Sequence, residues 1–209
     1  MGYGLVVLSA GCSGLLSFCF LAVSIGTDYW YIIDVNKPNY TDSAELSSYS
    51  GLWRINEGSN KSSVIPSFTA NMSALSDVER HLLKLHKAVV IILPLGLVLL
   101  VFGWIFGLVS SLACSPKLLT GTAFYFLICS LFTVTGVSLY IEYSNKAMEE
   151  FQRVVAPKEL AYVKVSFGWS FIMTWISFAL ELAAGLLLLL AAKIIQMRGR
   201  YDCGIAVTL

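Results

Sequence analysis

The sequence predicts an all-α membrane bundle with a small β ectodomain: four transmembrane helices that carry an antiparallel sheet from two extracellular loops. Three observations predict this fold. Hydrophobic residues make up 57% of the 209 residues, charged residues make up 13%, and the mean hydropathy is +0.75. This leaves too few charges for the surface of an ordinary soluble domain. The second and third observations are four long apolar runs and one polar stretch that contains every N-x-[ST] sequon.

The four predicted spans are the apolar runs 5–27, 88–113, 118–140 and 166–192. Each run exceeds the roughly 20 residues that a helix needs to cross a hydrocarbon core of about 30 Å. We therefore expect a single four-span domain that contacts membrane lipid, without a separate soluble domain. The net charge of +1 gives no reason to expect a nucleic acid partner.

The orientation in the membrane is predicted from the sequons at Asn39, Asn60 and Asn71, which all lie in the polar stretch 28–87. A sequon is glycosylated only if it reaches the secretory lumen. We therefore expect loop one, 28–87, to be extracellular. Counting spans then makes loop two, 141–165, extracellular as well, and makes both termini cytoplasmic, including the tail 193–209.

The basic residues oppose this orientation. Only four of the 14 Lys and Arg residues fall on the predicted cytoplasmic side, namely Lys117, Lys193, Arg198 and Arg200. The positive-inside rule weakens for loops of about 60 residues, but the shorter loop two also carries basic residues. We give the sequons more weight.

The first run has no charged residue between Met1 and Thr27. A signal peptide has a positive n-region and a shorter apolar core, so this pattern favours an uncleaved anchor. Ala22-Val23-Ser24 is an acceptable cleavage site, and the alternative stays open.

Strand patterns occur in both extracellular loops. Tyr29–Val35 is aromatic and β-branched, Leu52–Ile55 alternates briefly, and Tyr162–Val165 is a candidate third strand. Gly, Pro, Ser and Asn clusters surround the first two. Trp30 and Trp53 are the expected apolar anchors of the sheet. They either pack in the core, with the membrane interface as a further place for Trp30, or contact a partner directly.

The second span shows three features. Glu79–Lys87 has helical spacing and runs into the span, and Pro94 is expected to bend it. Gly103 and Gly107 form a GxxxG pair, which lets helices approach closely in lipid. This pair serves either packing within the bundle or dimerisation.

Glu181 lies near the middle of the fourth span. An ionisable residue there costs roughly 3 kcal/mol on insertion scales and is a candidate functional residue. Alternatively, Glu181 is protonated or hydrogen-bonded and ties its helix to a Ser or Thr on a neighbouring span.

The five cysteines lie outside both extracellular loops, so no ectodomain disulfide is expected; they are Cys12, Cys19, Cys114, Cys129 and Cys203. Cys114 and Cys203 are candidate palmitoylation sites near the inner membrane face, and unmodified thiols are the alternative. The tail ends Val207-Thr208-Leu209, a pattern that PDZ domains bind by strand addition.

No catalytic, cofactor-binding or metal-binding pattern is found. His81 and His86 are five residues apart, which is off the i, i+4 spacing that places two ligands on one helical face, and HExxH, P-loop and GxSxG motifs are absent. We therefore expect that the protein is not an enzyme.

Several motifs carry a family resemblance. A first span followed by Trp30, then Gly51-Leu52-Trp53 and three further spans, resembles the claudin superfamily, which includes peripheral myelin protein and the calcium-channel gamma subunits. The extended motif Ser50–Arg54, the opening Gly168-Trp169-Ser170 and Glu181 are similar to the gamma-subunit branch. The stretches Thr27–Ile32 and Leu93–Leu95 look closest to the transmembrane protein 114/235 group. The resemblance implies a claudin-like four-helix bundle topped by an antiparallel sheet.

One departure from the family pattern concerns two cysteines that usually follow Gly-Leu-Trp and form a disulfide. Here the corresponding positions look to be Asn56 and about Ser62. Loss of such a bond typically costs about 2–4 kcal/mol. It also weakens a transfer of claudin-type pore or strand assembly to this chain.

The resemblance implies two functions, both at the plasma membrane. The first is an accessory or regulatory subunit that packs on a channel or receptor of the calcium-channel or glutamate-receptor type. The second is a cell–cell junction or adhesion component. Three glycans on loop one would add bulk where adhesion needs bare surface, which favours the first. A homo-oligomer is possible in either case, and a self-contained pore or transporter is disfavoured, because the sequence shows no inverted repeat.

Overall fold

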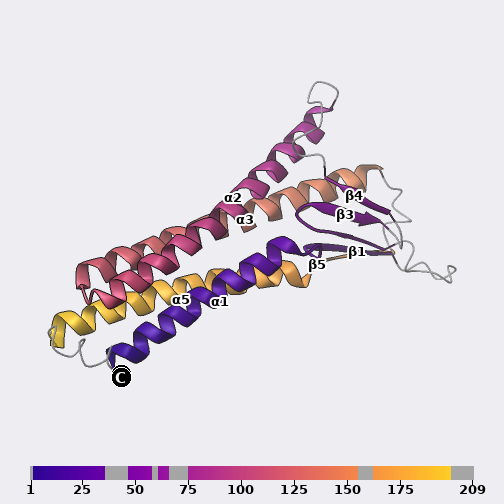
Figure 1. The fold of residues 1–209 in the computed structure, drawn as a ribbon. Coiled ribbons are helices and arrows are strands. Elements are labelled where there is room, and N and C mark those ends of the chain that lie inside the picture. Colours follow the sequence, from indigo (N-terminus) through magenta and orange to yellow (C-terminus); the bar gives the residue numbers. More distant parts are fainter. Residues whose placement is uncertain (1, 36–46, 58–60, 66–74, 155–161, 199–209) are drawn as a thin grey trace. The chain divides into compact units, whose positions relative to one another are not determined.

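The computed structural model describes residues 2–35, 47–57, 61–65, 75–154 and 162–198 (Figure 1). Within these residues the elements in chain order are α1 (Tyr3–Gly26), β1 (Tyr31–Val35), β2 (Ser48–Ser50), β3 (Arg54–Glu57), β4 (Lys61–Val64), α2 (Asp77–Leu112), α3 (Pro116–Val154), β5 (Val163–Phe167) and α5 (Trp169–Arg198). All four helices are long and apolar enough to cross a membrane. The predicted fold class, a four-helix membrane bundle with a small antiparallel sheet, is confirmed.

Contacts divide the chain into two compact units. Unit 1 comprises Met1–Ala22, Pro94–Val134 and Trp175–Leu209, and unit 2 comprises Val23–Leu93 and Thr135–Thr174. Each of the four helices contributes one part to each unit. The described part of unit 1 is helical apart from the α2–α3 turn, whereas unit 2 contains the sheet and the helical segments nearest to it in sequence.

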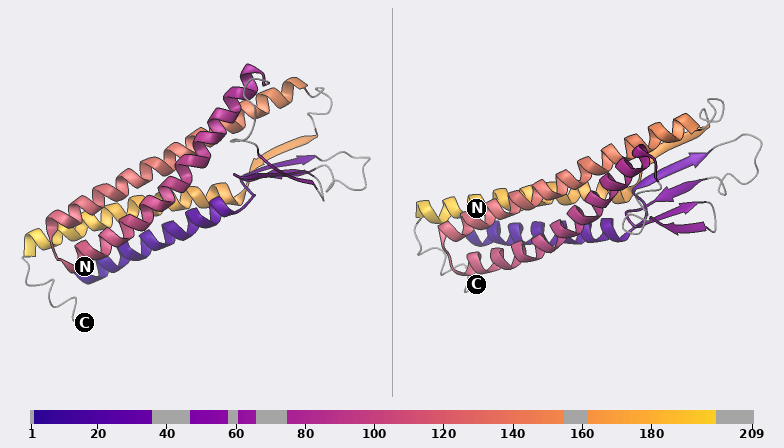
Figure 2. Two further views of the ribbon diagram at one scale, coloured as in Figure 1. Left: turned by 45° about the horizontal axis from the view of Figure 1, so that its top comes forward. Right: turned by 90° about the horizontal axis from the view of Figure 1, so that it is seen from above.

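The sheet of unit 2 has five strands in the order β4-β3-β2-β1-β5 (Figure 2). All four strand pairs are antiparallel. Tyr31 of β1 pairs with Ser50 of β2 on one side and with Phe167 of β5 on the other. Since β5 lies between α3 and α5 in the sequence, the sheet joins residues from both predicted extracellular loops.

The register gives the sheet two unlike faces, because successive side chains point to opposite sides of a strand. Paired residues share a face, so one face carries Tyr31, Ile33, Ile55, Val165 and Phe167. The other face carries Ile32, Asp34, Tyr49, Asn56, Lys164 and Ser166. The first face is apolar along β1 and β5 but also carries Ser48 and Ser50 of β2 and Ser63 of β4, whereas the second face is mixed to polar.

Local sequence signals explain where α2 and α3 begin. Ser76 and Glu79 form a capping box before α2: the Ser76 amide donates to Glu79 Oε2 at 2.9 Å, and the Glu79 amide donates to Ser76 Oγ at 3.3 Å. Pro116 is the first residue of α3, a position where its missing N–H costs nothing. Cys114 adopts a left-handed φ of 49° in the turn between the two helices.

The helices differ in extent from the predicted spans. Helix α2 begins at Asp77 and α3 continues to Val154, so both include charged turns beyond the apolar runs. Helix α5 begins at Trp169 rather than at Ser166, because Ser166 and Phe167 pair with β1 as part of β5. The opening residues of the fourth apolar run therefore belong to the sheet.

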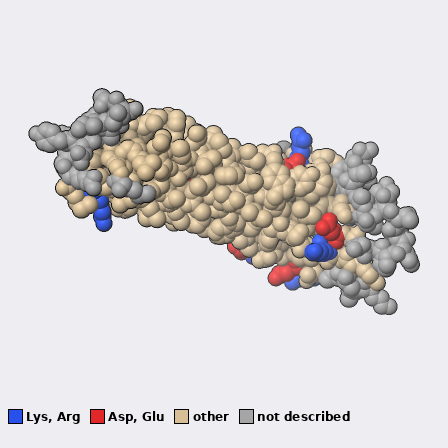
Figure 3. Space-filling view, turned by 90° about the horizontal axis from the view of Figure 1, so that it is seen from below, with Lys and Arg blue, Asp and Glu red and all other residues tan. Residues whose placement is uncertain are grey.

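The surface of the helices is rich in large apolar side chains. Leu8, Leu112, Leu131 and Leu186 each expose more than 60% of their surface. One face of the molecule shows a wide area without Lys, Arg, Asp or Glu (Figure 3). Such a surface is compatible with hydrocarbon as its surrounding solvent and makes the chain a multi-pass membrane protein.

Candidate functional site

The family-motif residues converge on one place in unit 2, which we call the junction. It consists of the end of α1 with Tyr29 and Trp30, the segment Gly51–Trp53, and the segment Gly168–Ser170. These pieces are far apart in the sequence, and backbone hydrogen bonds connect them.

Trp30 lies at the centre of the junction. It is fully buried, and its indole Nε1 donates to the carbonyl oxygen of Ser24 at 2.8 Å. Its ring centroid lies 4.7 Å from that of Tyr140 and 6.1 Å from that of Phe171. Trp30 therefore packs in the core of unit 2, which matches the first of its two interpretations and leaves no surface for a partner.

The Gly51-Leu52-Trp53 motif is explained residue by residue. The Trp30 amide donates to Ser50 O at 3.0 Å, and a Cβ atom on residue 51 would overlap Asp28, so only glycine fits. Leu52 is fully buried. Trp53 is 40% exposed, but its Nε1 donates to Ile25 O at 2.9 Å.

Arg54 closes the motif turn through its backbone. Its carbonyl oxygen accepts a hydrogen bond from the Gly51 amide at 2.8 Å, and the residue begins β3. The Arg54 side chain is exposed. Arg54 thus contributes backbone geometry to the junction and leaves a cation at the surface of the sheet.

The Gly168-Trp169-Ser170 segment at the start of α5 forms hydrogen bonds with the backbone of Tyr29 and Trp30. The amides of Gly168 and Ser170 donate to the carbonyl oxygens of Trp30 at 2.9 Å and Tyr29 at 3.1 Å. A Cβ atom on residue 168 would overlap the Tyr29 carbonyl. Trp169 stacks on Tyr29 with ring centroids 5.8 Å apart.

A row of hydroxyl groups joins α1 to α5 beside the junction. Ser24 Oγ lies 2.5 Å from Thr174 Oγ1 and 2.6 Å from Ser170 O, and Thr27 Oγ1 lies 2.8 Å from Ser170 Oγ. The sequence reading missed these partners. The sequence feature that could have indicated these partners is a polar stripe along one face of α5. Its residues recur at helical spacing: Ser170, Thr174, Ser177 and Glu181.

Glu181 is the polar centre of unit 1. It is fully buried, and Thr133 Oγ1 lies 2.9 Å and 3.0 Å from its two carboxyl oxygens. Ser17 and Ser177 lie 3.4 Å from Oε1 and 2.9 Å from each other. The carboxyl group thus ties α5 to α3 and α1, which is the geometry of the interhelical alternative.

The GxxxG glycines face the inside of unit 1. A Cβ atom on residue 103 would lie 2.9 Å from Tyr125 Cε1, and one on residue 107 would lie 4.0 Å from Phe126 and Thr122. Helix α3 therefore packs against this side of α2. The geometry is that of packing within the bundle.

The two histidines serve different contacts. His81 Nε2 lies 2.9 Å from Lys146 Nζ, whereas His86 is buried and its ring centroid lies 5.1 Å from that of Tyr143. Among the described residues, no group of three or more His, Cys, Asp and Glu could hold a metal ion.

In β1, burial raises the pKa of Tyr31 above its ordinary value of 10.0, which keeps its hydroxyl protonated.

The structure describes only some of the remaining predicted site residues. The sequons at Asn39, Asn60 and Asn71, the candidate PDZ ligand at Val207 and Leu209, and Cys203 all lie outside the described residues. Cys114 forms a disulfide in this structure, and palmitoylation at Cys114 and Cys203 stays a prediction. Cys12, Cys19 and Cys129 are free thiols.

Comparisons with known proteins match this geometry. A model of the PMP-22/EMP/MP20/Claudin tight junction family matches residues 15–190, which include the whole described junction and Glu181. The chain is also similar to the voltage-dependent calcium channel gamma-5 subunits of Mus musculus and Homo sapiens, at 26% identity over 179 residues. Each match covers 80% of this chain but only 62% of the relative. The similarity to the transmembrane protein 114/235 group stays a prediction.

The family match spans most of the chain, and the motif residues that carried the resemblance form one hydrogen-bonded structure. The predicted superfamily, which joins claudins and calcium-channel gamma subunits, is confirmed. The chain belongs to the PMP-22/EMP/MP20/Claudin tight junction family.

Proposed function

We propose that this chain is a plasma-membrane accessory subunit that regulates a partner membrane protein, an ion channel or a receptor of the calcium-channel or glutamate-receptor type. The observation that carries the proposal is the similarity to calcium-channel gamma-5 subunits along 80% of the chain. A chain of this kind acts by binding, which agrees with the packed and backbone-bonded side chains of the junction.

The structure offers two surfaces for such a partner. The exposed apolar side chains of the helices suit lateral packing against the transmembrane helices of another protein. The mixed-to-polar face of the sheet, with Asp34, Arg54 and Lys164, suits contact with an ectodomain. The hydrogen bonds of the junction join the sheet to the ends of α1 and α5 within unit 2.

The proposed orientation places the sheet outside the cell and both termini in the cytoplasm. The three sequons support it, since all of them fall in the segment that contains β1 to β4. In this orientation the α2–α3 turn faces the cytoplasm, a compartment where disulfides are rare, so the disulfide at Cys114 opposes the orientation and the sequons are given more weight. The whole chain then acts as a single four-span domain.

A role in cell–cell adhesion is the second candidate, and the family description, which names tight junctions, favours it. Two features of this chain argue against it. Glycans at Asn39, Asn60 and Asn71 would occupy the loop that adhesion needs bare, and the residues at the family's disulfide positions, Asn56 and Ser62, cannot cross-link β3 to β4.

The test is co-expression of the full chain with the pore-forming subunit of a voltage-dependent calcium channel. We expect co-purification in detergent at constant stoichiometry together with a shift in the voltage dependence or amplitude of the current. A parallel assay measures enrichment at contacts between transfected non-junctional cells. Enrichment at contacts without co-purification or current change would contradict the accessory role and support adhesion.

A further inference from the structure

A groove on the surface of unit 1 runs along α2 and α3 close to the turn that joins them. It has a volume of about 260 Å³, and its lining includes Phe106 and Val109 of α2 and Lys117, Gly121 and Tyr125 of α3. Lys117 is the only charged residue in the lining. The groove thus combines an apolar bed with one cation at the helix end.

Gly121 borders the open part of the groove. A Cβ atom there would meet nothing within 4 Å, so the space beside Gly121 is open. Between Lys117 and Tyr125 the groove extends roughly 12 Å along α3, at 1.5 Å per residue. Its direction is therefore that of the helix, which is also the direction in which acyl chains lie beside a membrane-spanning helix.

The neutral polar side chains of the lining already have partners. Ser110 Oγ donates to Gly107 O at 3.0 Å, Thr122 Oγ1 donates to Leu118 O at 2.9 Å, and Tyr125 Oη donates to Leu99 O at 2.9 Å. These hydroxyls have used their protons on backbone carbonyls. The walls of the groove consequently offer hydrocarbon and aromatic surface to an occupant.

Lys117 is different, because its side chain is exposed and pairs with no acidic side chain in the part of the chain that the structure describes. It is the second residue of α3, where the helix dipole adds positive potential. A cation at the end of an apolar groove complements an anionic head group attached to an acyl chain.

We propose that this groove binds one anionic phospholipid of the bilayer, with its phosphate at Lys117 and an acyl chain along the bed from Gly121 to Tyr125. This site goes beyond the proposed function. It lies in the membrane leaflet next to the α2–α3 turn, whichever side of the membrane that turn faces.

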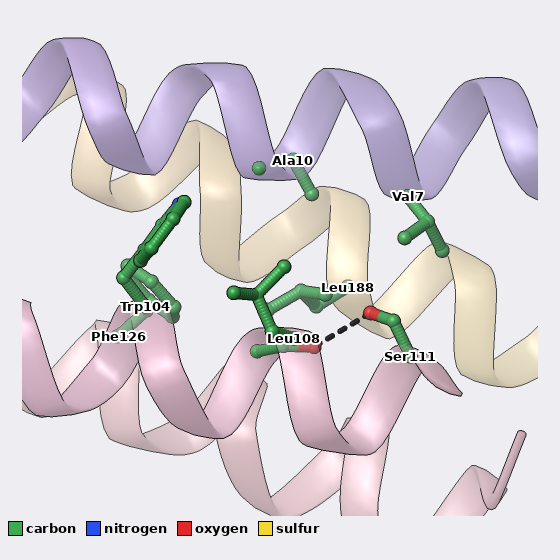
Figure 4. Close-up of a pocket in the computed structure, with 9 residues that line it drawn as sticks. Val7, Ala10, Trp104, Leu108, Ser111, Phe126 and Leu188 are labelled. Carbon is green, nitrogen blue, oxygen red and sulfur yellow. Dashed lines mark hydrogen bonds between the residues drawn. The ribbon is translucent and has the colours of Figure 1, made fainter. Parts of the chain in front are cut away.

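A second cavity in unit 1 provides an internal comparison. It lies among α1, α2, α3 and α5 and is lined by residues such as Val7, Ala10, Trp104, Leu108 and Leu188 (Figure 4). Its volume is about 60 Å³, and its one hydroxyl, on Ser111, donates to Gly107 O at 2.6 Å. Without a charged residue in its lining, this cavity has no means to select a head group.

The experiment is native mass spectrometry of the full chain titrated with phosphatidylserine or with phosphatidylcholine of identical acyl chains. We expect one phosphatidylserine to be retained with roughly fivefold preference, the factor that one basic side chain supplies near an anionic surface. Lys117→Gln should abolish the preference. Lys193→Gln, which neutralises a lysine of α5 at another surface groove, should keep it.

The acyl-chain half of the site is tested by filling the groove. Gly121→Leu should prevent labelling of the groove residues in the 106–125 segment by a phosphatidylserine with a photoreactive acyl chain. Gly26→Leu, at a glycine of α1 where a Cβ atom also meets nothing within 4 Å, should leave the labelling intact. Equal retention of both lipids by the unmodified chain, or equal loss of preference in both lysine variants, would overturn the proposal. These readouts need no partner protein, so they are independent of the proposed accessory role.

Discussion

Asn56 of β3 and Ser62 of β4 are directly paired neighbours on adjacent antiparallel strands. These are the positions that the family resemblance implies for a disulfide, and the register places them as antiparallel partners, whose Cα atoms are typically about 4.5–5.5 Å apart. That separation falls within the range that a disulfide spans. The sheet has thus kept the geometry of the cross-link without the cysteines.

We predict that the double variant Asn56→Cys, Ser62→Cys forms a disulfide spontaneously in the secretory pathway. The bond would close a short loop between β3 and β4 and should stabilise unit 2 by about 2 kcal/mol, at the low end of typical values. Non-reducing peptide mapping and melting temperature measure this. The control pair Asn56→Cys, Ser63→Cys is out of register and should stay reduced; cross-linking in both pairs alike would contradict the observed register.

The carboxyl group of Glu181 gives a second prediction. Glu181→Gln keeps an acceptor for Thr133 and should fold and reach the cell surface. Glu181→Lys places an unpaired cation among buried hydroxyls, at a cost of roughly 3 kcal/mol or more, and should be retained in the cell. Surface biotinylation compares the two, and equal surface levels would show that Glu181 is not buried as described.

Thr133→Val tests the same contact from α3. Removal of the hydroxyl donor should lower the melting temperature in detergent by the equivalent of about 1 kcal/mol. In the Glu181→Gln background the cost should become smaller, since the donor would then serve a neutral amide. Additive effects of the two substitutions would indicate that the residues do not interact.

The junction glycines provide a matched comparison. Gly51→Ala and Gly168→Ala each introduce a methyl group where Asp28 or the Tyr29 backbone already lies, so each should destabilise unit 2 by roughly 1–3 kcal/mol. Gly26→Ala, where a Cβ atom meets nothing within 4 Å, is the control and should be close to neutral. Thermal unfolding in detergent ranks the three variants; a Gly26 effect as large as the other two would remove the steric explanation.

The two tryptophans of the junction should differ in the same assay. Trp30→Ala empties a fully buried site and should cost about 3–5 kcal/mol, enough to prevent surface expression. Trp53 is 40% exposed, so Trp53→Ala should cost less and still permit surface expression. A variant at Trp30 that reaches the surface as well as the one at Trp53 would contradict the core placement of Trp30.

Much of this architecture could be predicted from the sequence because its causes are local. The apolar runs define four helices by length alone, and aromatic and β-branched residues mark β1 and β5. The strands β2 and β4 were missed, since Ser48–Ser50 and Lys61–Val64 have no apolar alternation and owe their conformation to pairing with β1 and β3.

The site was predictable in its residues but not in its contacts. Trp30, Gly51, Leu52 and Trp53 could be singled out as motif residues, yet nothing in the sequence shows that Gly168 lies on the backbone at Tyr29 and Trp30. Glu181 stood out as an intramembrane carboxyl group. Its partners Ser17 and Ser177 did not, because small hydroxyl residues are common in transmembrane helices and only packing decides which of them meet.

The proposed role of the sheet requires that its segment lies outside the cell, and protease protection in sealed microsomes tests this directly. Protease added to the cytosolic side should leave the segment from Asn39 to Asn71 intact and glycosylated, so that subsequent glycosidase treatment shifts its mobility. Digestion of that segment from the cytosolic side would contradict the orientation and, with it, the proposed role of the sheet.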